Sequence, residues 1–216
     1  MPSTTPPRPG RRDRRRDRHE ATKREILDTA WTMVRADGLA ALSLRALAHA
    51  VDMEPQSLYT YFASKNALYD RMFADGNEEL ASRFAEAEIP AEARGALRAV
   101  AGIFTDFAVQ DQARYQLMFL RAVPGFQPSP ESYAIAVELL DSVKKLLRRA
   151  GLHSEADFDL WTAILAGLAS QQLANEPGGD RYIRLIDDAV AMFADHILGR
   201  GQSHGPAPDP QPAPDS

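Results

Sequence analysis

Residues 56–61 concentrate hydroxyl and amide side chains of the kind that bind phosphates and the edges of bases. On a short helix, Leu58 and Phe62 would be buried, and the remaining side chains would form an outer face without any carboxylate. Hydroxyl and amide groups donate and accept hydrogen bonds, so this face suits the groove of a nucleic acid. The outward side chains are Gln56, Ser57, Tyr59, Thr60 and Tyr61.

Two short helices joined by a tight turn are predicted to hold this face. Ser43 offers a side-chain oxygen to the first amides of the first helix. Pro55, with a fixed φ and no N–H, suits the first position of the second helix. The break is predicted at Asp52 to Glu54, because Asp52 tolerates the left-handed backbone of a helix exit. The buried stripe of the first helix is Leu44, Leu47, Ala48 and Val51.

Lys65 is predicted to begin a further helix and to act as a phosphate clamp. A helix N-terminus offers unpaired amides to an anion, and the ammonium group adds charge there. Tyr61, with Ser43 or Thr60, would be its neutral partner on the DNA backbone, where contacts position a protein without reading sequence. The alternative is a two-helix unit that only packs, with Tyr59 and Tyr61 as ordinary surface aromatics.

A longer motif surrounds the second helix: Leu58-Tyr59-x-Tyr61-Phe62-x-Ser64-Lys65-x-Ala67-Leu68. A Thr/Ser-x-Arg helix start and a longer helix that ends at Asp37-Gly38 precede it. Together these features resemble the DNA-binding domain of TetR/AcrR-type transcriptional regulators, over about residues 22–70. The resemblance implies a DNA-binding head, a double-stranded DNA operator as partner, and a helical regulatory body.

Base reading is expected from the beginning of the second helix and from one arginine of the first. Gln pairs with the two-point edge of adenine and Arg with that of guanine, and Arg45 resembles a guanine-contacting arginine of the family. Asp52 stands where the family most often has glycine. Glu54, where many members have Ser or Thr, either caps the helix or accepts from a cytosine amine. The expected base-reading residues are Arg45, Pro55, Gln56, Ser57 and Tyr59.

Charge is distributed unevenly along the chain, whose formal net charge is −5. Residues 1–65 hold 12 Lys/Arg against 8 Asp/Glu, a net +4, and residues 66–216 hold 13 against 22, a net −9. A basic head on an acidic body favours an oriented approach to DNA. Without cysteine, without an apolar run of about 18 residues and without a signal peptide, the chain is expected to be cytoplasmic, with no disulfide and no membrane partner.

Residues 1–18 are expected to form a disordered arm, because they are rich in arginine and proline and almost devoid of apolar side chains. The hypothesis is that the arm lies along the DNA backbone or enters an adjacent minor groove. The alternative is a solvated tail that adds only solubility. The arginines are Arg8, Arg11, Arg12, Arg14, Arg15, Arg16 and Arg18.

An all-α fold is predicted, with an N-terminal three-helix DNA-binding domain (residues 19–65) that contains the helix-turn-helix. Its first helix should run over about residues 20–36. A C-terminal helical dimerisation and ligand-binding domain (66–199) and a disordered tail (200–216) should follow. Asp111 and Ser154 are plausible N-caps in this domain. Its helices are expected at about 65–87, 91–109, 111–121, 131–150, 155–174 and 180–198.

The last two predicted helices are the expected dimer interface. Small side chains in 155–174 permit close helix approach, and the final helix supplies larger apolar ones. In the resembled family these two helices pair with their symmetry mates, and a homodimer matches a near-palindromic operator. The alternative is that the small residues serve packing within the chain. The expected interface residues are Ala163, Gly167, Ser170, Ile186, Val190 and Phe193.

An aromatic set beyond residue 100 could line a pocket for a small apolar effector, although such residues are more often simply core. Phe158-x-x-Trp161 followed by Ala166-Gly167 resembles a C-terminal subgroup with a Trp-His-Gly signature, in which Ala166 replaces the histidine. Repression released by an effector is the family-level expectation. The expected pocket residues are Phe104, Phe107, Tyr115, Phe119 and Trp161.

Catalysis is not expected. The five histidines are scattered without metal-ligand spacing, and there is no cysteine, glycine-rich phosphate loop or nucleophile elbow. No cofactor, metal or catalytic residue is therefore predicted. The remaining rival function is a helical interaction module that binds nucleic acid non-specifically through its arginine-rich arm.

Overall fold

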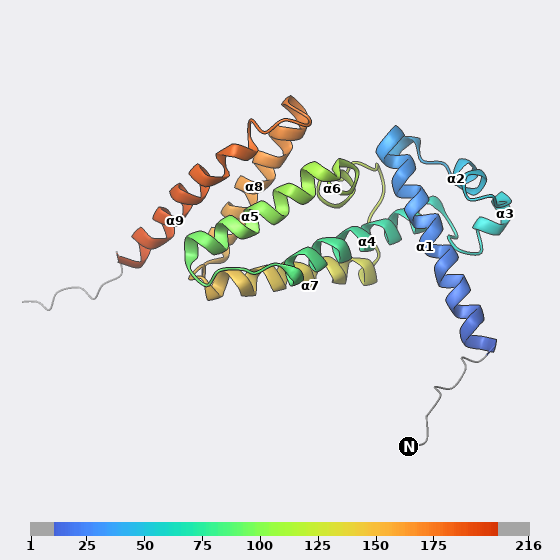
Figure 1. Cartoon of the computed structure of the whole chain (residues 1–216), viewed down its shortest axis with the longest axis horizontal. Helices are drawn as coiled ribbons and strands as arrows, with labels where there is room; N and C mark the ends of the chain where they lie inside the picture. The colour runs from blue at the N-terminus through green and yellow to red at the C-terminus, as the bar shows by residue number, and fades with distance from the viewer. Residues whose placement is uncertain (1–10, 203–216) are drawn as a thin grey trace, which may run out of the picture. The chain divides into compact units, whose positions relative to one another are not determined.

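The computed structural model describes residues 11–202 of the 216-residue chain. This part contains α-helices and two short 3-10 helices but no strand, so the all-α prediction is confirmed (Figure 1). The first six elements are α1 (Arg11–Asp37), η1 (Leu39–Ala41), α2 (Leu44–Ala50), α3 (Pro55–Leu58), α4 (Lys65–Glu86) and α5 (Ala93–Gln110). The others are α6 (Gln112–Phe119), α7 (Pro130–Arg149), α8 (Glu155–Asn175), η2 (Ile183–Leu185) and α9 (Ile186–Gln202).

The chain divides into two compact units. The first comprises Met1–Arg83 with Gln110–Leu140, and the second comprises Phe84–Val109 with Asp141–Ser216. The first unit therefore holds the helix-turn-helix together with α6 and the beginning of α7. This division differs from the predicted boundary at residue 65, because Ala113 and Leu117 of α6 belong to the same buried cluster as α1 to α4.

Both ends of the helical part extend further than predicted. α1 begins at Arg11, so the prediction of a disordered arm is wrong for residues 11–18. Arginine is a good helix former, and adding residues to an existing helix avoids the cost of nucleation. α9 continues to Gln202 and so includes the first three residues, 200–202, of the predicted tail. Residues 1–10 of the predicted arm and 203–216 of the predicted tail lie outside the described residues.

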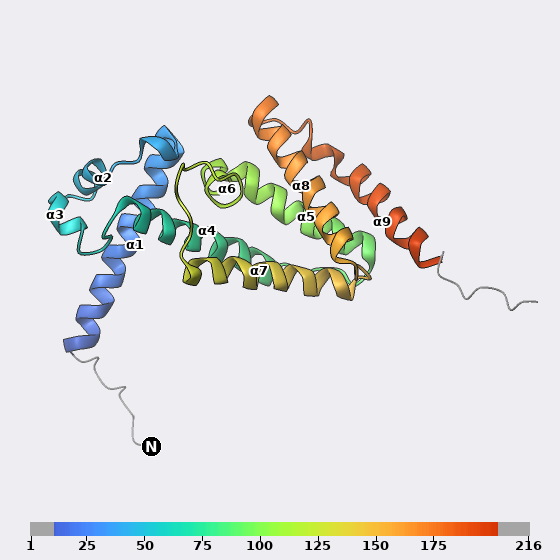
Figure 2. The ribbon, with the colours of Figure 1, turned by 180° about the vertical axis from the view of Figure 1, so that it is seen from behind.

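The core of the first unit joins α1 to the helix-turn-helix and to α4. Figures 1 and 2 both show α2 and α3 beside α1. Each fully buried aliphatic side chain contributes about 1.5–3 kcal/mol relative to exposure, so this cluster fixes α2 and α3 firmly. Its most deeply buried members include Ile26, Trp31, Leu47, Leu58, Leu68 and Met72.

The second unit packs α8 against α9. The indole ring of Trp161 stacks on Phe193, with ring centroids 4.9 Å apart. Ser154 accepts a hydrogen bond from the Asp157 amide at 3.3 Å, which confirms it as the N-cap of α8. In the first unit Asp111 likewise caps α6 by accepting from the Arg114 amide, as predicted.

Candidate nucleic-acid interface

α2 begins where the sequence predicts. Ser43 is its N-cap, with extended backbone angles, and its hydroxyl accepts from the Ala46 amide at 3.5 Å. Leu47 and Ala48 are fully buried beneath it. Arg45 is exposed on the other side and makes no hydrogen bond within the described part of the chain. The guanidinium of Arg45 is therefore available to a partner.

The turn between α2 and α3 also follows the prediction. Asp52 has a φ of 52°, the left-handed conformation expected of a helix exit, and the Met53 amide donates to the Ala48 carbonyl at 2.8 Å. Glu54 is the N-cap residue of α3 and Pro55 is its first helical residue. The Glu54 side chain makes no capping hydrogen bond, so the capping role considered for it is not realised.

α3 itself is one turn long, shorter than the sequence indicates, and a hydrogen-bonded turn continues it. The Thr60 hydroxyl donates to the Ser57 carbonyl at 2.7 Å, where it competes with regular helix geometry. Leu58 and Phe62 anchor the segment in the core, as predicted. The polar outer face is exposed: Gln56, Ser57, Tyr59 and Thr60.

Tyr61 is less exposed than expected, because its ring stacks on His19 of α1. The ring centroids are 4.7 Å apart and the planes are inclined by 17°. Next to it, Lys23 of α1 lies over the Phe62 ring at 5.8 Å. The sequence motif contains no signal for these contacts, since they join residues about 40 positions apart. They tie the beginning of α1 to the segment that follows α3.

Lys65 lies in the first turn of α4, as predicted, but its ammonium group is already engaged. Nζ donates to the Ala40 carbonyl at 3.3 Å and lies 5.4 Å from the Tyr69 ring centre. Ser64 accepts from the Ala67 amide at 3.0 Å and so caps the helix. An ammonium group has three donors, which leaves donors of Lys65 for an anion beside the helix N-terminus.

A buried charge network lies behind this surface, and sequence reasoning missed it. Asp75 of α4 exposes only 4% of its surface. It accepts from Arg24 at 2.8 Å, from the Trp31 indole N–H at 2.8 Å and from Arg114 at 3.0 Å. Arg35 in turn donates to Asp111 at 2.6 Å, and the Trp31 ring lies beneath both Arg35 and Arg114. The network joins α1, α4 and α6.

The five predicted pocket residues are divided between the two compact units. Tyr115 and Phe119 lie in the first, with ring centroids 5.4 Å apart. Phe104, Phe107 and Trp161 lie in the second. Phe107, Tyr115 and Trp161 are fully buried and Phe119 is exposed. The Trp161 indole N–H has no hydrogen-bond partner in the described residues. The effector pocket stays a prediction.

Three of the predicted dimer residues belong to the core of the second unit instead. Ile186, Val190 and Phe193 are buried within the chain, so the expectation that they form an exposed interface is corrected. α9 has apolar residues on more than one side: Met192 is exposed, as is Leu185 at the end of η2 just before α9. On α8, Ala163 and Gly167 are exposed and Ser170 is half-buried.

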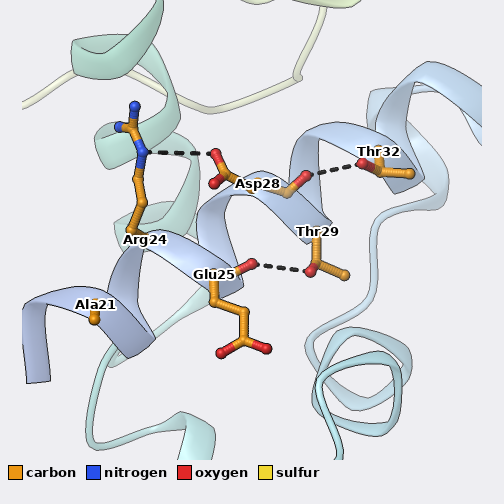
Figure 3. Close-up of a pocket in the computed structure, with 6 residues that line it drawn as sticks. All are labelled: Ala21, Arg24, Glu25, Asp28, Thr29 and Thr32. Atoms are coloured by element: carbon orange, nitrogen blue, oxygen red, sulfur yellow. Dashed lines mark hydrogen bonds and ion pairs between the residues drawn. The ribbon is translucent and has the colours of Figure 1, made fainter. Parts of the chain in front are cut away.

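Other kinds of site find little support among residues 11–202. The hollow shown in Figure 3 is lined by one helix only, through Ala21, Arg24, Glu25, Asp28, Thr29 and Thr32. No group of three or more metal-ligating side chains occurs in this part of the chain. None of its helices is both long and apolar enough to cross a membrane.

Comparison with known proteins agrees with the geometry of the helix-turn-helix. The family model of bacterial regulatory proteins of the tetR family matches residues 26–72. The HTH-type transcriptional regulator Rv1816 of Mycobacterium tuberculosis is 28% identical over 180 residues, which cover 82% of this chain and 66% of that protein. The chain thus spans slightly less than two thirds of the length of this curated relative.

Solved structures share the fold. A tetR-family transcriptional regulator from Streptomyces coelicolor has a TM-score of 0.66 at 18% identity, over 86% of this chain and 84% of that chain. The multidrug binding protein EbrR, complexed with imidazole, has a TM-score of 0.59 at 23% identity, over 82% and 92% of the two chains. The helix-turn-helix, the matching family model and the shared fold lead to one conclusion: residues 26–72 are similar to the DNA-binding domain of the tetR family of bacterial regulatory proteins, and the chain shares the fold of a solved tetR-family regulator.

Proposed function

We propose that this chain is a DNA-binding transcriptional regulator that reads a specific duplex sequence with α3 and the turn after it. The observation that carries the proposal is the exposed polar face of Gln56, Ser57, Tyr59 and Thr60, anchored from behind by Leu58. A recognition helix of this type places its first residues at base edges in the major groove. The name of Rv1816, an HTH-type transcriptional regulator, supports the same function.

Contacts to DNA divide into two kinds in this proposal. Lys65 at the N-terminus of α4 holds a phosphate, with Ser43, Thr60 and Tyr61 as neutral partners along the backbone. Arg45, Pro55, Gln56, Ser57 and Tyr59 face the bases, where Gln56 pairs with adenine and Arg45 with guanine. The carboxylate of Glu54, at the start of α3, makes no capping hydrogen bond. In this proposal it accepts a hydrogen bond from a cytosine amine.

Selection of binding sites from a random duplex pool, followed by two substitutions, tests this division. Gln56→Ala should relax discrimination at one base position, at a cost of about 1–3 kcal/mol on the selected duplex. Lys65→Ala should weaken selected and random duplexes alike and lower the log-log salt slope by about one unit. A Gln56→Ala variant that loses equal affinity for both duplexes would make Gln56 a backbone contact.

We further propose that two copies of the chain bind a near-palindromic operator through paired α8 and α9 helices. Leu160, Ala163 and Gly167 form an exposed small and apolar stripe on α8, and Met192 of α9 exposes 71% of its surface. A Cβ added at Gly167 would meet nothing within 4 Å. Packing within the chain therefore does not require a glycine at position 167. A helix of a second copy that approached closely at this point would require one.

The oligomeric state tests this interface. Met192→Glu should convert a dimer to a monomer in light-scattering measurements and remove the preference for two half-sites over one. α7 also has an exposed apolar stripe, Tyr133, Val137 and Leu140, so Val137→Glu is the matched control. If Val137→Glu breaks the dimer and Met192→Glu does not, α7 forms the interface and the proposal is overturned.

The regulator is proposed to act as a repressor that releases DNA when a small, largely apolar effector binds the aromatic residues near Phe107 and Trp161. Their complete burial supports an apolar environment. About 100-fold release requires a coupling free energy near 3 kcal/mol. Release of the selected duplex should be sought by fluorescence anisotropy with a panel of neutral aromatic compounds. A reporter gene placed behind the selected site should be expressed more strongly when the chain is absent.

A further inference from the structure

Residues 14–20, near the beginning of α1, form an arginine-rich stretch that contacts the rest of its unit through the stacking of His19 on Tyr61. Residues 14–20 are all exposed, and Figure 1 shows this segment, in dark blue, projecting beyond α3. Like charges four residues apart, such as Arg14 and Arg18, destabilise a helix. Residues 14–20 hold four arginines against Asp17 and Glu20, so binding of an anion would relieve this repulsion.

The charges of this segment are sorted between two faces. At about 100° per residue, Arg15 and Arg16 lie within about 60° of His19, and Lys23 lies within about 40° of it. Arg14 and Arg18 lie about 100° or more away, on the side that also carries Asp17. Between residues 14 and 23 the charged residues within about 60° of His19 are therefore all cationic, with Glu20 beside Arg16 at about 100°, whereas the opposite face is mixed.

The hollow in Figure 3 continues the mixed face and adds negative charge to it. Glu25 and Asp28 line it, and its one cation, Arg24, is paired with Asp75 at 2.8 Å and lies 3.7 Å from Asp28. A polyanion approaching α1 is therefore attracted to the His19 face and repelled from the far side.

The basic face is continuous with the proposed recognition surface. His19 stacks on Tyr61, which follows Thr60, so the contact places the basic face next to a proposed phosphate contact. α1 rises about 1.5 Å per residue, so Arg15 lies about 6 Å beyond His19. One DNA strand carries a phosphate about every 3.4 Å of its axis. The face can therefore reach one or two phosphates beyond those held by Tyr61.

We propose that the His19 face of α1, with Arg15 and Arg16, is a second DNA contact that holds backbone phosphates flanking the half-site read by α3. This inference rests on the proposed function. DNA is the occupant because the face is predominantly basic, with Glu20 only at its edge, is continuous with the recognition surface, and projects beyond it as a helix. The contact reads no bases, so it extends the length of duplex that the chain requires without changing the preferred sequence.

Two double variants with equal charge loss test the face. Arg15→Gln/Arg16→Gln should lower affinity for a selected duplex with flanks at least tenfold at about 0.1 M salt and reduce the log-log salt slope by about two units. Arg14→Gln/Arg18→Gln, on the other side, should change the slope by less than half as much. Equal losses from both variants would indicate a flexible arm and overturn the helical face. No loss from either would indicate a solvated tail.

A change of register at constant charge separates a helical contact from general attraction. Insertion of two glycines after Arg18 keeps every arginine but breaks the helix before His19, and should weaken binding as much as Arg15→Gln/Arg16→Gln. Wild-type affinity of the insertion variant would contradict the proposal.

Trimming the selected duplex to its bare half-sites separates this contact from sequence reading. The difference between the wild type and Arg15→Gln/Arg16→Gln should then disappear. If the wild type prefers the selected duplex, but Arg15→Gln/Arg16→Gln binds the duplex with long flanks as tightly as the wild type does, only the α1 contact fails. If the wild type prefers no duplex at all, the proposed function fails. Equal loss on single-stranded RNA would also overturn the proposal, because it would indicate general polyanion binding.

Discussion

The carboxylates of the ion pairs between α1, α4 and α6 are buried in the first unit, whereas both partners of the pairs between α5 and α9 in the second unit are exposed. Asp75 exposes 4% of its side chain to solvent and accepts from three donors. Arg98 and Asp187 form an equally short pair, at 2.6 Å, yet their side chains expose 66% and 64%. Distance alone therefore does not measure what an ion pair contributes, because water screens the second pair and not the first.

The two units also differ in whether the indole N–H of their buried tryptophan has a hydrogen-bond partner. The Trp31 indole N–H donates to Asp75 at 2.8 Å. The Trp161 indole N–H, also fully buried, has no partner in the described residues. A buried unpaired donor costs about 1–3 kcal/mol. The buried tryptophan of the first unit thus helps to join the helices behind α2 and α3 through a hydrogen bond to a carboxylate, whereas that of the second unit contributes by ring stacking on Phe193.

The largest effect should come from removing the central carboxylate. Asp75→Asn removes the nearest negative partner of the largely buried Arg114, which keeps only Asp111 at 3.6 Å, and we expect a loss of about 3–5 kcal/mol in the free energy of unfolding. Urea unfolding followed by far-UV circular dichroism measures it. The double variant Asp75→Leu/Arg114→Met should recover much of the loss, because a well-packed apolar pair replaces the buried ions. A loss below about 1 kcal/mol for Asp75→Asn would place this pair with the exposed ones.

An intermediate effect should distinguish the two tryptophans. Trp31→Phe and Trp161→Phe remove the same volume, but only the first removes a hydrogen bond to a carboxylate. We therefore expect Trp31→Phe to cost about 1.5–3 kcal/mol more than Trp161→Phe. Equal losses in urea unfolding would mean that Trp161 has a hidden partner of similar strength, and the contrast between the units would disappear.

The smallest effect should come from the exposed pairs between α7 and α8. Lys144 and Arg148 donate to Glu155 and hold the pKa of this carboxyl below its usual range. A lowered pKa stabilises the fold above the usual value, near 4.3, and this contribution is lost as the pH falls through the lowered pKa. Glu155→Gln should lower the unfolding midpoint slightly at about pH 7 and not at all near pH 2.5. If the midpoints of the wild type and Glu155→Gln differed more at acid pH than at about pH 7, the stabilising role given to the charged Glu155 carboxylate would be contradicted.

Local signals explain why much of the recognition region could be predicted from the sequence. Ser43 as N-cap, Asp52 at the helix exit and Pro55 at the next helix start each depend on neighbours within four residues. The structure bears out all three. The burial of Leu58 and Phe62 follows from helix periodicity in the same way.

Long-range contacts had no comparable signal. Asp75 is a lone acidic residue in a buried stretch of α4, and its partners stand 39 to 51 positions away. The His19–Tyr61 stack is likewise invisible in either local pattern. In α9, apolar residues occur on more than one side, so periodicity could not decide whether Phe193 or Met192 faces the core; the structure buries Phe193.

The central claim is that the exposed polar face of α3 reads sequence, and competition binding tests it most directly. The full chain is titrated onto a labelled duplex from the random-pool selection, with and without excess random duplex at fixed salt. We predict that the complex survives the competitor, with the selected duplex bound at least about 1000-fold more tightly than the random one. Equal displacement by random DNA would contradict the account and favour non-specific binding through the arginine-rich segment.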